Sequence, residues 1–249
     1  MIMKIVAISG GKLRAGNNID KEIIRLTGKV KPNILFLPTA SEYPGSSSMD
    51  SETNYKLFQD SFEKKLGCKT DVLYLVKEKH TKQEIKKKIL SSDIIYVGGG
   101  STLKLLKVWR KLGVDKVLKQ AYKKGIVLSG ISAGGICWFK YGHTIESVKK
   151  GKRVMKVRGL DFFPFFVCPH YDNQKFRKPS LRRMIKKYGG FSIALDAFSA
   201  IEIVDGQYKI ITSSKSARAY RVYLRKGKVV EEELPKDKKF RPLAELFKR

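Results

Sequence analysis

Residues 126–139 read IVLSGISAGGICWF, an apolar run that breaks at a cluster of small residues and then resumes. Inside it, GISAG (130–134) is a G-x-S-x-G sequence that follows an expected strand and precedes an expected helix. A sharp strand-to-helix turn lifts the serine hydroxyl out of the sheet, and the flanking glycines allow backbone contacts that a Cβ would block. The N–H of the next residue then faces the place where an oxyanion forms. The stretch predicts either a nucleophilic serine at Ser132 or an ordinary turn of small residues.

Apolar, β-rich runs recur along the first half of the chain, and helix-period segments separate them. Apolar runs flanked by helices on both sides indicate strands that are buried on both faces, as in a parallel sheet. The alternation predicts an α/β fold, doubly wound, with a mostly parallel sheet and helices on both faces. The expected strands are 4–9, 33–40, 71–76, 93–100 and 126–130, and the expected helices are 19–28, 49–65, 81–91, 101–112 and 114–124.

The pattern changes after residue 190, where short strands and turns replace the helices. Turns are expected at Asp205-Gly206 and at Lys226-Gly227, between runs of alternating apolar residues. We expect a C-terminal antiparallel β extension packed on the same sheet. No linker and no repeat divides the chain, so residues 1–249 are expected to form a single α/β domain. The polar stretch 41–52 is interpreted as a long loop at the carboxyl edge of the sheet.

The chain is strongly basic, with a formal net charge of +29 over 249 residues. Such a charge raises the possibility of a nucleic-acid or membrane-surface partner. The lysines and arginines are spread over expected helix faces, with no basic tail and no zinc-finger spacing, so nucleic-acid binding is not expected as the main function. Weak, nonspecific, salt-sensitive binding to polyanions is expected. The sequence leaves open whether the protein is a monomer or a homodimer.

The three cysteines, Cys68, Cys137 and Cys168, include no CxxC pair. Their odd number and wide spacing favour a reducing compartment, without disulfides or a structural zinc site. The N-terminal stretch has no signal-peptide pattern, and no apolar run reaches the length of a membrane span. We therefore expect a cytoplasmic protein with no membrane partner, no metal and no cofactor.

A serine nucleophile needs a base, and the chain offers three histidines. His80 lies in a charged stretch and is interpreted as a solvated surface residue, and His143 is expected in a loop. His170 ends the apolar run FFPFFVCPH (162–170), which would deliver it to the same sheet edge as Ser132. The alternative for His170 is a core histidine bonded to a backbone carbonyl.

A third group should orient the imidazole of the base. Asp172 is very close to His170 in sequence, which makes the required geometry difficult. Glu146 lies between Ser132 and His170 in the chain, and it is the preferred candidate.

A glycine run, Gly98-Gly99-Gly100, follows another expected strand and precedes a helix. It lacks the lysine and the spacing of a phosphate-binding loop. Because a neighbouring strand also ends in a glycine turn, the run is interpreted as the source of a second oxyanion donor.

Three separated motifs together resemble one family. They are VGGGSTLKLLK (97–107), GISAGGICWF (130–139) and CPHYDN (168–173), and the segment 192–213 is also similar to the family's C-terminal part. The family is peptidase E, the aspartyl dipeptidases, which is related to the cyanophycinases. The resemblance covers nearly the whole chain and implies a fold similar to class I glutamine amidotransferases, with serine in place of the nucleophilic cysteine.

The resemblance implies that Ser132 is the nucleophile, His170 the base and Glu146 the acidic member, where an aspartate is common. Gly99 and Ala133 would supply the oxyanion hole, and Gly100 would contact the substrate; Ser101 stands where the family has asparagine. The implied activity is hydrolysis of short peptides, above all dipeptides with an N-terminal aspartate, through an acyl-enzyme. A substrate carboxylate needs a cationic pocket, and the candidates after His170 are Arg177, Arg182 and Arg183.

Two other functions compete with a serine peptidase. An esterase of the α/β-hydrolase class shares the G-x-S-x-G sequence and the order serine, acid, histidine, but usually has its histidine much later in the chain. A non-catalytic, polyanion-binding protein on the same scaffold would account for the net charge but not for Ser132 and His170.

Overall fold

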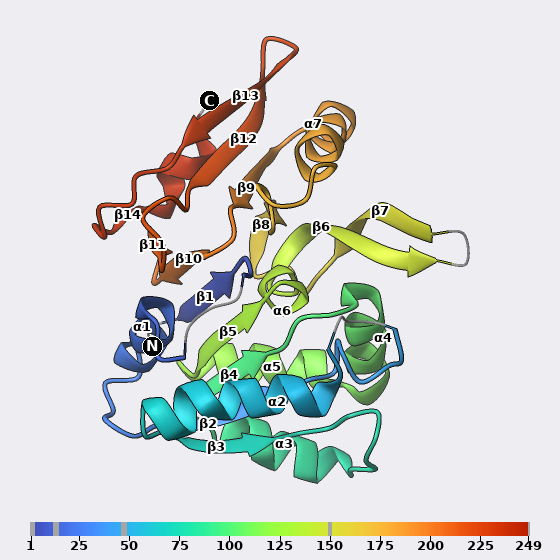
Figure 1. Ribbon diagram of the computed structural model, residues 1–249, viewed down its shortest axis with the longest axis vertical. Helices are drawn as coiled ribbons and strands as arrows, with labels where there is room; N and C mark the ends of the chain where they lie inside the picture. The colour runs from blue at the N-terminus through green and yellow to red at the C-terminus, as the bar shows by residue number, and fades with distance from the viewer. Residues whose placement is uncertain (1–2, 12–14, 46–48, 149–150, 249) are drawn as a thin grey trace.

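The computed structural model describes residues 3–11, 15–45, 49–148 and 151–248, without the side chains of 146–148 and 151–153. The chain forms two sheets: the parallel strands of the first lie in the lower half of Figure 1, and the strands of the second lie in the upper half. The expected α/β class is confirmed: helices cover both faces of a sheet whose central strands are parallel.

The first sheet contains a strand near each of the five expected in the N-terminal half, with the third at Lys69–Val72 in place of the expected 71–76, and antiparallel strands extend it at one edge. Strands β1, β5, β4, β2 and β3 run parallel in that spatial order, and β10 pairs antiparallel with β1. All four residues of β4 are buried, as expected for a strand that is covered on both faces. The order across the sheet is β14 (Arg241–Pro242), β11 (Gln207–Thr212), β10 (Ser199–Val204), β1 (Lys4–Ile8), β5 (Val127–Ile131), β4 (Ile94–Val97), β2 (Asn33–Leu37) and β3 (Lys69–Val72).

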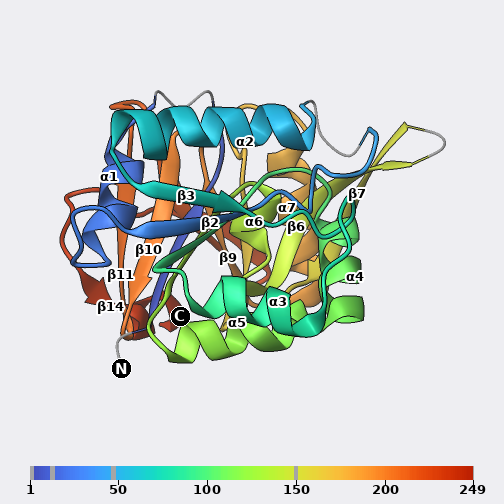
Figure 2. The same cartoon turned by 90° about the horizontal axis from the view of Figure 1, so that it is seen from below.

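Helices lie on both faces of this sheet, as Figure 2 shows. One face carries α1 (Asn18–Arg25), α2 (Ser51–Gln59) and the π-helical continuation of α2, η1 (Asp60–Lys65). The other face carries α3 (Lys82–Leu90), α4 (Thr102–Leu112) and α5 (Val114–Lys123). Local sequence sets these boundaries: Thr81 and Glu84 form a capping box at the start of α3, and left-handed Gly113 separates α4 from α5. None of the helices in the described ranges is long and apolar enough to cross a bilayer.

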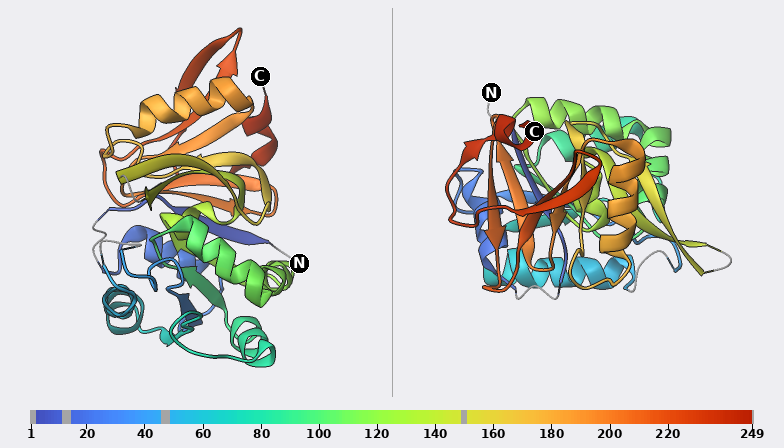
Figure 3. Two further views of the ribbon diagram at one scale, coloured as in Figure 1. Left: turned by 90° about the vertical axis from the view of Figure 1, so that its right-hand side faces the viewer. Right: turned by 90° about the horizontal axis from the view of Figure 1, so that it is seen from above.

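In the second sheet, the aromatic strand β8 (Phe163–Cys168) lies between two hydrophobic clusters. Phe165 and Val167 of β8 pack into the main core, which also contains Leu128 of β5. Their neighbours on the strand point the other way, where Cys168 packs under Leu181 of α7 (Arg177–Tyr188). Figure 3 shows α7 on the outer side of this sheet. The order is β13 (Lys228–Glu233), β12 (Ala219–Arg225), β9 (Phe191–Leu195), β8 (Phe163–Cys168), β6 (Phe139–Val148) and β7 (Gly151–Arg158).

The expectation that the whole C-terminal extension packs on the first sheet is wrong. Only β10, β11 and β14 join that sheet, whereas β9, β12 and β13 belong to the second one. The chain changes sheets at residues 196–198, where Phe198 has a φ of 67° and its N–H donates to the carbonyl of Gly10. The expected turns at Asp205-Gly206 and Lys226-Gly227 are confirmed, because all four residues have positive φ. The β6–β7 hairpin was not expected from the sequence.

The G-x-S-x-G turn is packed against the ends of the neighbouring strands. It connects β5 to the four-residue helix α6 (Ala133–Ile136). A Cβ on Gly134 would lie 2.1 Å from the carbonyl oxygen of Val97 in β4, and one on Gly135 would lie 2.6 Å from that of Ile8 in β1. The glycines are therefore required by backbone contacts with both neighbouring strands, as both interpretations of the turn expect.

The variant Gly134→Ala should lower the free energy of unfolding by about 1–3 kcal/mol or more, because the new Cβ meets backbone that cannot rotate away. The matched control is Gly99→Ala: its nearest contact would be the Ser132 Cβ at 3.4 Å, an ordinary contact distance. Urea denaturation of both variants measures the difference. Equal denaturation midpoints would contradict the packing described for α6.

Candidate active site

Ser132 lies at the apex of the turn between β5 and α6, in a backbone conformation that is rare for a non-glycine residue. Its φ is 56° and its ψ is −110°. Its N–H donates to the carbonyl of Ile8 at 3.0 Å, and its carbonyl accepts from the N–H of Ile136 at 2.9 Å. These two hydrogen bonds hold a strained residue in place, as is common where a side chain is presented for chemistry.

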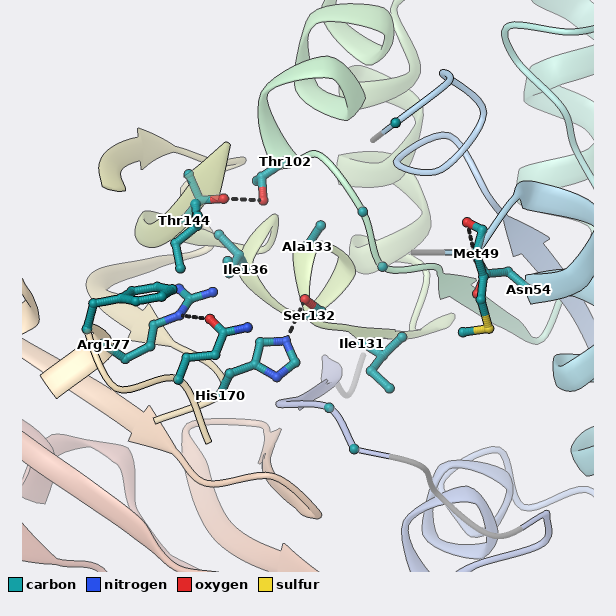
Figure 4. Close-up of a pocket in the computed structure, with 18 residues that line it drawn as sticks. Met49, Asn54, Thr102, Ile131, Ser132, Ala133, Ile136, Thr144, His170 and Arg177 are labelled. Atoms are coloured by element: carbon teal, nitrogen blue, oxygen red, sulfur yellow. Dashed lines mark hydrogen bonds between the residues drawn. The ribbon is translucent and has the colours of Figure 1, made fainter. Parts of the chain in front are cut away.

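His170 comes from the second sheet, two residues after β8, and its side chain reaches Ser132. The Nε2 atom lies 2.9 Å from the Ser132 Oγ, as Figure 4 shows. The His170 backbone also has positive φ, 58°. Its N–H donates to Ser9 Oγ at 2.7 Å, and that hydroxyl donates to the carbonyl of Leu195 at 2.9 Å. Ser9, at the end of β1, thus connects His170 to both sheets; the sequence analysis did not identify it.

The His170 ring lies against Gly10, where a Cβ would be only 2.2 Å from the ring carbon Cε1. Burial and, to a smaller extent, the positive charge of Arg177 lower the pKa of His170 to about 4, against the opposing effect of Asp172. The imidazole is therefore neutral at pH 7. A neutral Nε2 can accept the proton of a serine hydroxyl.

Asp172 and Glu146 are the two candidates from the sequence for the acidic group that orients the His170 imidazole. The Asp172 carboxylate raises the pKa of His170, but its Oδ1 accepts a hydrogen bond from the Ala197 N–H. Glu146 is a β6 residue in register with Arg153, and its side chain lies outside the described residues. Within the described part of the chain, no carboxylate hydrogen-bonds the Nδ1 of His170.

Two backbone amides lie beside the Ser132 hydroxyl. Gly99 follows β4, and a Cβ on it would be 4.0 Å from the Ser132 Oγ; Ala133 is the next residue after the serine. Neither N–H donates to another group in the described ranges. Gly100 has a φ of 138° and packs against the carbonyl of Ala40, which fixes the path of the glycine turn. The expectation that these two amides bind an oxyanion therefore stays a prediction.

A cavity of about 570 Å³ surrounds Ser132 and is lined by residues from both sheets. In Figure 4, Arg177 and Thr144 lie on one side of Ser132, and Met49 and Asn54 lie on the other. The lining includes Gly10, Gly99, Gly100, Ser132, Ala133, His170, Gln174 and Arg177.

Arg177 is a buried cation whose hydrogen bonds go to neutral groups. Only 4% of the residue is exposed. Its Nε donates to Gln174 Oε1 at 2.7 Å, and its Nη1 donates to the carbonyl and Nδ1 of His143. Among the described residues no carboxylate forms an ion pair with it. A buried charge without a counter-ion favours an anionic ligand.

His143 is buried in β6 and is not the loop residue that the sequence suggested. An arginine N–H can only donate, so the Nδ1 of His143 accepts, and its Nε2–H donates to Ser180 Oγ at 2.6 Å. Burial, together with the charge of Arg177, lowers the pKa of His143 to about 3. His143 is therefore neutral and holds the Arg177 guanidinium, and it does not line the cavity around Ser132.

The other expected arginines lie elsewhere on α7. Arg182 pairs with Glu231 of β13, 3.4 Å away, and Arg183 lines a separate cavity beside Lys156 of β7. Neither lines the cavity around Ser132. His80 is mostly covered rather than fully solvated, and its Nε2 lies 3.0 Å from the carbonyl of Tyr74.

The described side chains contain no group of three or more His, Cys, Asp or Glu that could hold a metal. All three cysteines are free and buried. Burial raises the pKa of the Cys68 thiol to about 11, so this thiol is protonated at neutral pH.

The model of peptidase family S51 matches residues 5–211. The uncharacterized peptidase YgaJ of Bacillus subtilis is 33% identical over 237 residues, covering 93% of this chain and 97% of the relative. The uncharacterized peptidase Lmo0363 of Listeria monocytogenes is 27% identical, covering 69% of this chain and 83% of the relative.

Two solved structures share the fold. A peptidase from an acI-B1 Actinobacterium has a TM-score of 0.73 at 17% identity and covers 97% of each chain. A protein assigned to peptidase E from Listeria monocytogenes EGD-e has a TM-score of 0.59 at 20% identity. The match covers 94% of this chain and 100% of the Listeria chain. The family match and the similarity to YgaJ, both extending over most of the sequence, place this chain in peptidase family S51.

Proposed function

We propose that the protein is a serine exopeptidase that hydrolyses short peptides through an acyl-enzyme on Ser132. The hydrogen bond between Ser132 Oγ and His170 Nε2 is the observation that carries this proposal. A neutral imidazole beside a strained serine, with two unused amides next to the hydroxyl, meets the requirements of nucleophilic acyl transfer.

In the first half of the reaction, His170 removes the proton of Ser132 as Oγ attacks the scissile carbonyl. The N–H groups of Gly99 and Ala133 stabilise the oxyanion of the tetrahedral intermediate. His170 then gives the proton to the leaving amine, which departs as the shortened peptide or amino acid. Water attacks the acyl-enzyme with His170 again as the base, and Ser132 is regenerated.

The preferred substrate in this proposal is a dipeptide with an N-terminal aspartate. The support is Arg177, which lines the cavity without a carboxylate partner among the described residues. The hydrogen-bond partners of its guanidinium are the uncharged side chains of Gln174, His143 and Cys168, so its charge is left for a substrate carboxylate. The net charge of +29 favours the approach of acidic peptides to the molecule.

The Ser132→Ala and His170→Gln variants should each lose at least about 10³-fold in kcat/KM, because the nucleophile or its base is gone. The assay uses chromogenic aspartyl, asparaginyl, glutamyl and leucyl substrates, and Ser91→Ala, an exposed serine outside the cavity, is the control. Aspartyl hydrolysis that persists in Ser132→Ala would refute the nucleophile assignment.

The Arg177→Gln variant should lose about 10- to 100-fold in kcat/KM for the aspartyl substrate, because a charge-assisted hydrogen bond is removed. The uncharged asparaginyl substrate should change much less. Arg182→Gln is the matched control on the same helix, since Arg182 is paired with Glu231 outside the cavity. An unchanged ratio of aspartyl to asparaginyl hydrolysis in Arg177→Gln would exclude Arg177 as the carboxylate contact.

The reactivity of Ser132 should depend on a single deprotonation near pH 4, the pKa to which burial and Arg177 lower His170. Because the pKa is lowered, the base stays neutral and active at neutral pH, and reactivity is lost as the pH falls through about 4. The rate of inactivation by an uncharged phosphonate measures this without a titrating substrate. In the Arg177→Gln variant, the midpoint of this pH transition should move upward, toward pH 6.5. A midpoint near pH 6.5 in the wild type would contradict the buried environment of His170.

A further inference from the structure

A second cavity, of about 520 Å³, lies between the first sheet and the helix pair α2–η1. Aromatic rings form much of its wall: Phe36 from β2, Tyr96 from β4, Phe58 from α2 and Phe62 from η1. Ring centroids of Phe36 and Phe58 are 4.8 Å apart, as are those of Phe58 and Phe62. These rings belong to the second core cluster, so the wall of the cavity exists before any ligand binds.

The aromatic cavity adjoins the cavity around Ser132. The two share Gly11, Met49, Asn54, Gly99 and Ile131. Gly99 carries one of the two free amides, and Ile131 directly precedes Ser132 in the chain. In Figure 4 the shared residues Ile131, Met49 and Asn54 lie on the side of Ser132 opposite Arg177. A peptide bond at Ser132 would therefore have Arg177 on one side and the aromatic cavity on the other.

The two sides differ in charge. Among the residues that the structure describes, no lysine or arginine lines the aromatic cavity, and its acidic lining residues are Asp20 and Asp60. Asp20 is buried and accepts hydrogen bonds from Asn17 and Ser61, and Asp60 pairs with Lys64. Among the described lining residues, a substrate carboxylate would meet other carboxylates and no basic side chain, whereas an apolar side chain would leave water for aromatic surface.

We propose that the aromatic cavity is the subsite for the side chain of the leaving residue, and that the substrates are dipeptides of aspartate followed by a large apolar residue. This inference rests on the proposed function, because Arg177 is taken to hold the aspartate. With the aspartyl side chain on the Arg177 side of Ser132, the leaving residue extends to the other side, where the aromatic cavity begins.

The test compares kcat/KM for Asp-Ala, Asp-Leu, Asp-Phe and Asp-Lys, with Phe-Ala as an added substrate. Asp-Leu and Asp-Phe should exceed Asp-Ala by about 10- to 100-fold, the range that differences in apolar side-chain size give in an enzyme pocket. Asp-Lys should not share this gain, because its ammonium group would have to be desolvated among aromatic rings.

The variant Leu57→Asn places a polar group at the cavity mouth, where Leu57 lines the wall and is 51% exposed. It should lower the ratio of Asp-Phe to Asp-Ala hydrolysis about 10-fold. Lys56→Asn is the matched control, since Lys56 is the exposed neighbour on α2 and lines neither cavity. The ratio of Asp-Phe to Asp-Ala hydrolysis in Lys56→Asn should equal that of the wild type.

The outcomes separate the inference from the proposed function. Equal kcat/KM for Asp-Ala and Asp-Phe, with turnover that depends on Ser132, would overturn the subsite and leave the peptidase proposal intact. A preference for Phe-Ala over Asp-Ala would overturn both the assignment of the cavity to the leaving residue and the proposed preference for an N-terminal aspartate. The absence of turnover on every dipeptide would overturn the proposed function itself.

Discussion

The hydrogen bond between Ser132 and His170 joins the two sheets, and the arrangement of the site depends on it. Each partner has a positive φ, which costs free energy for a residue with a side chain. The surroundings compensate for this cost. The backbone of Ser132 is bound to β1 through Ile8, and the backbone of His170 is bound to Ser9 at the end of the same strand. Strand β1 and the residue that follows it therefore hold the backbones of both Ser132 and His170 in position.

The electrostatics of the site follow from one buried cation. Arg177 is held by neutral partners, and its charge helps keep both His143 and His170 unprotonated. The same charge thus has two effects: it keeps the imidazole in the form that accepts a proton, and it attracts an anion to the cavity. Burial strengthens both effects, because little water screens the guanidinium.

The glycine turns at the ends of β4 and β5 divide the site into two unlike halves. On one side, the cavity is lined by α7 and β6 of the second sheet and contains Arg177. On the other side, it opens toward the aromatic core between the first sheet and α2. The second half is made of core residues whose packing also stabilises the fold, so its shape is fixed by the same contacts that hold α2 and η1 on the sheet.

Much of the fold could be predicted from the sequence because its signals are local. The apolar runs, the helix periods and the glycine turns identified five strands, five helices and the candidate residues Ser132 and His170. The distribution of the C-terminal strands between two sheets could not be predicted, because β9 and β10 have similar patterns and differ only in which strands they pair with. The sequence also could not predict which of Arg177 and Arg182 lines the cavity, because both are arginines of the same helix.

By itself, the sequence determined the α/β class, the position of the strand-to-helix turn at Ser132 and the presence of a histidine at the end of a buried strand. Those properties depend on residue type and short-range spacing. Only the tertiary structure decided that Ser9 supports His170, that Arg177 rather than Arg182 lines the cavity, and that an aromatic cavity adjoins Ser132. Each of these depends on contacts between segments far apart in the chain, and such contacts are set by how the two sheets and their helices pack together.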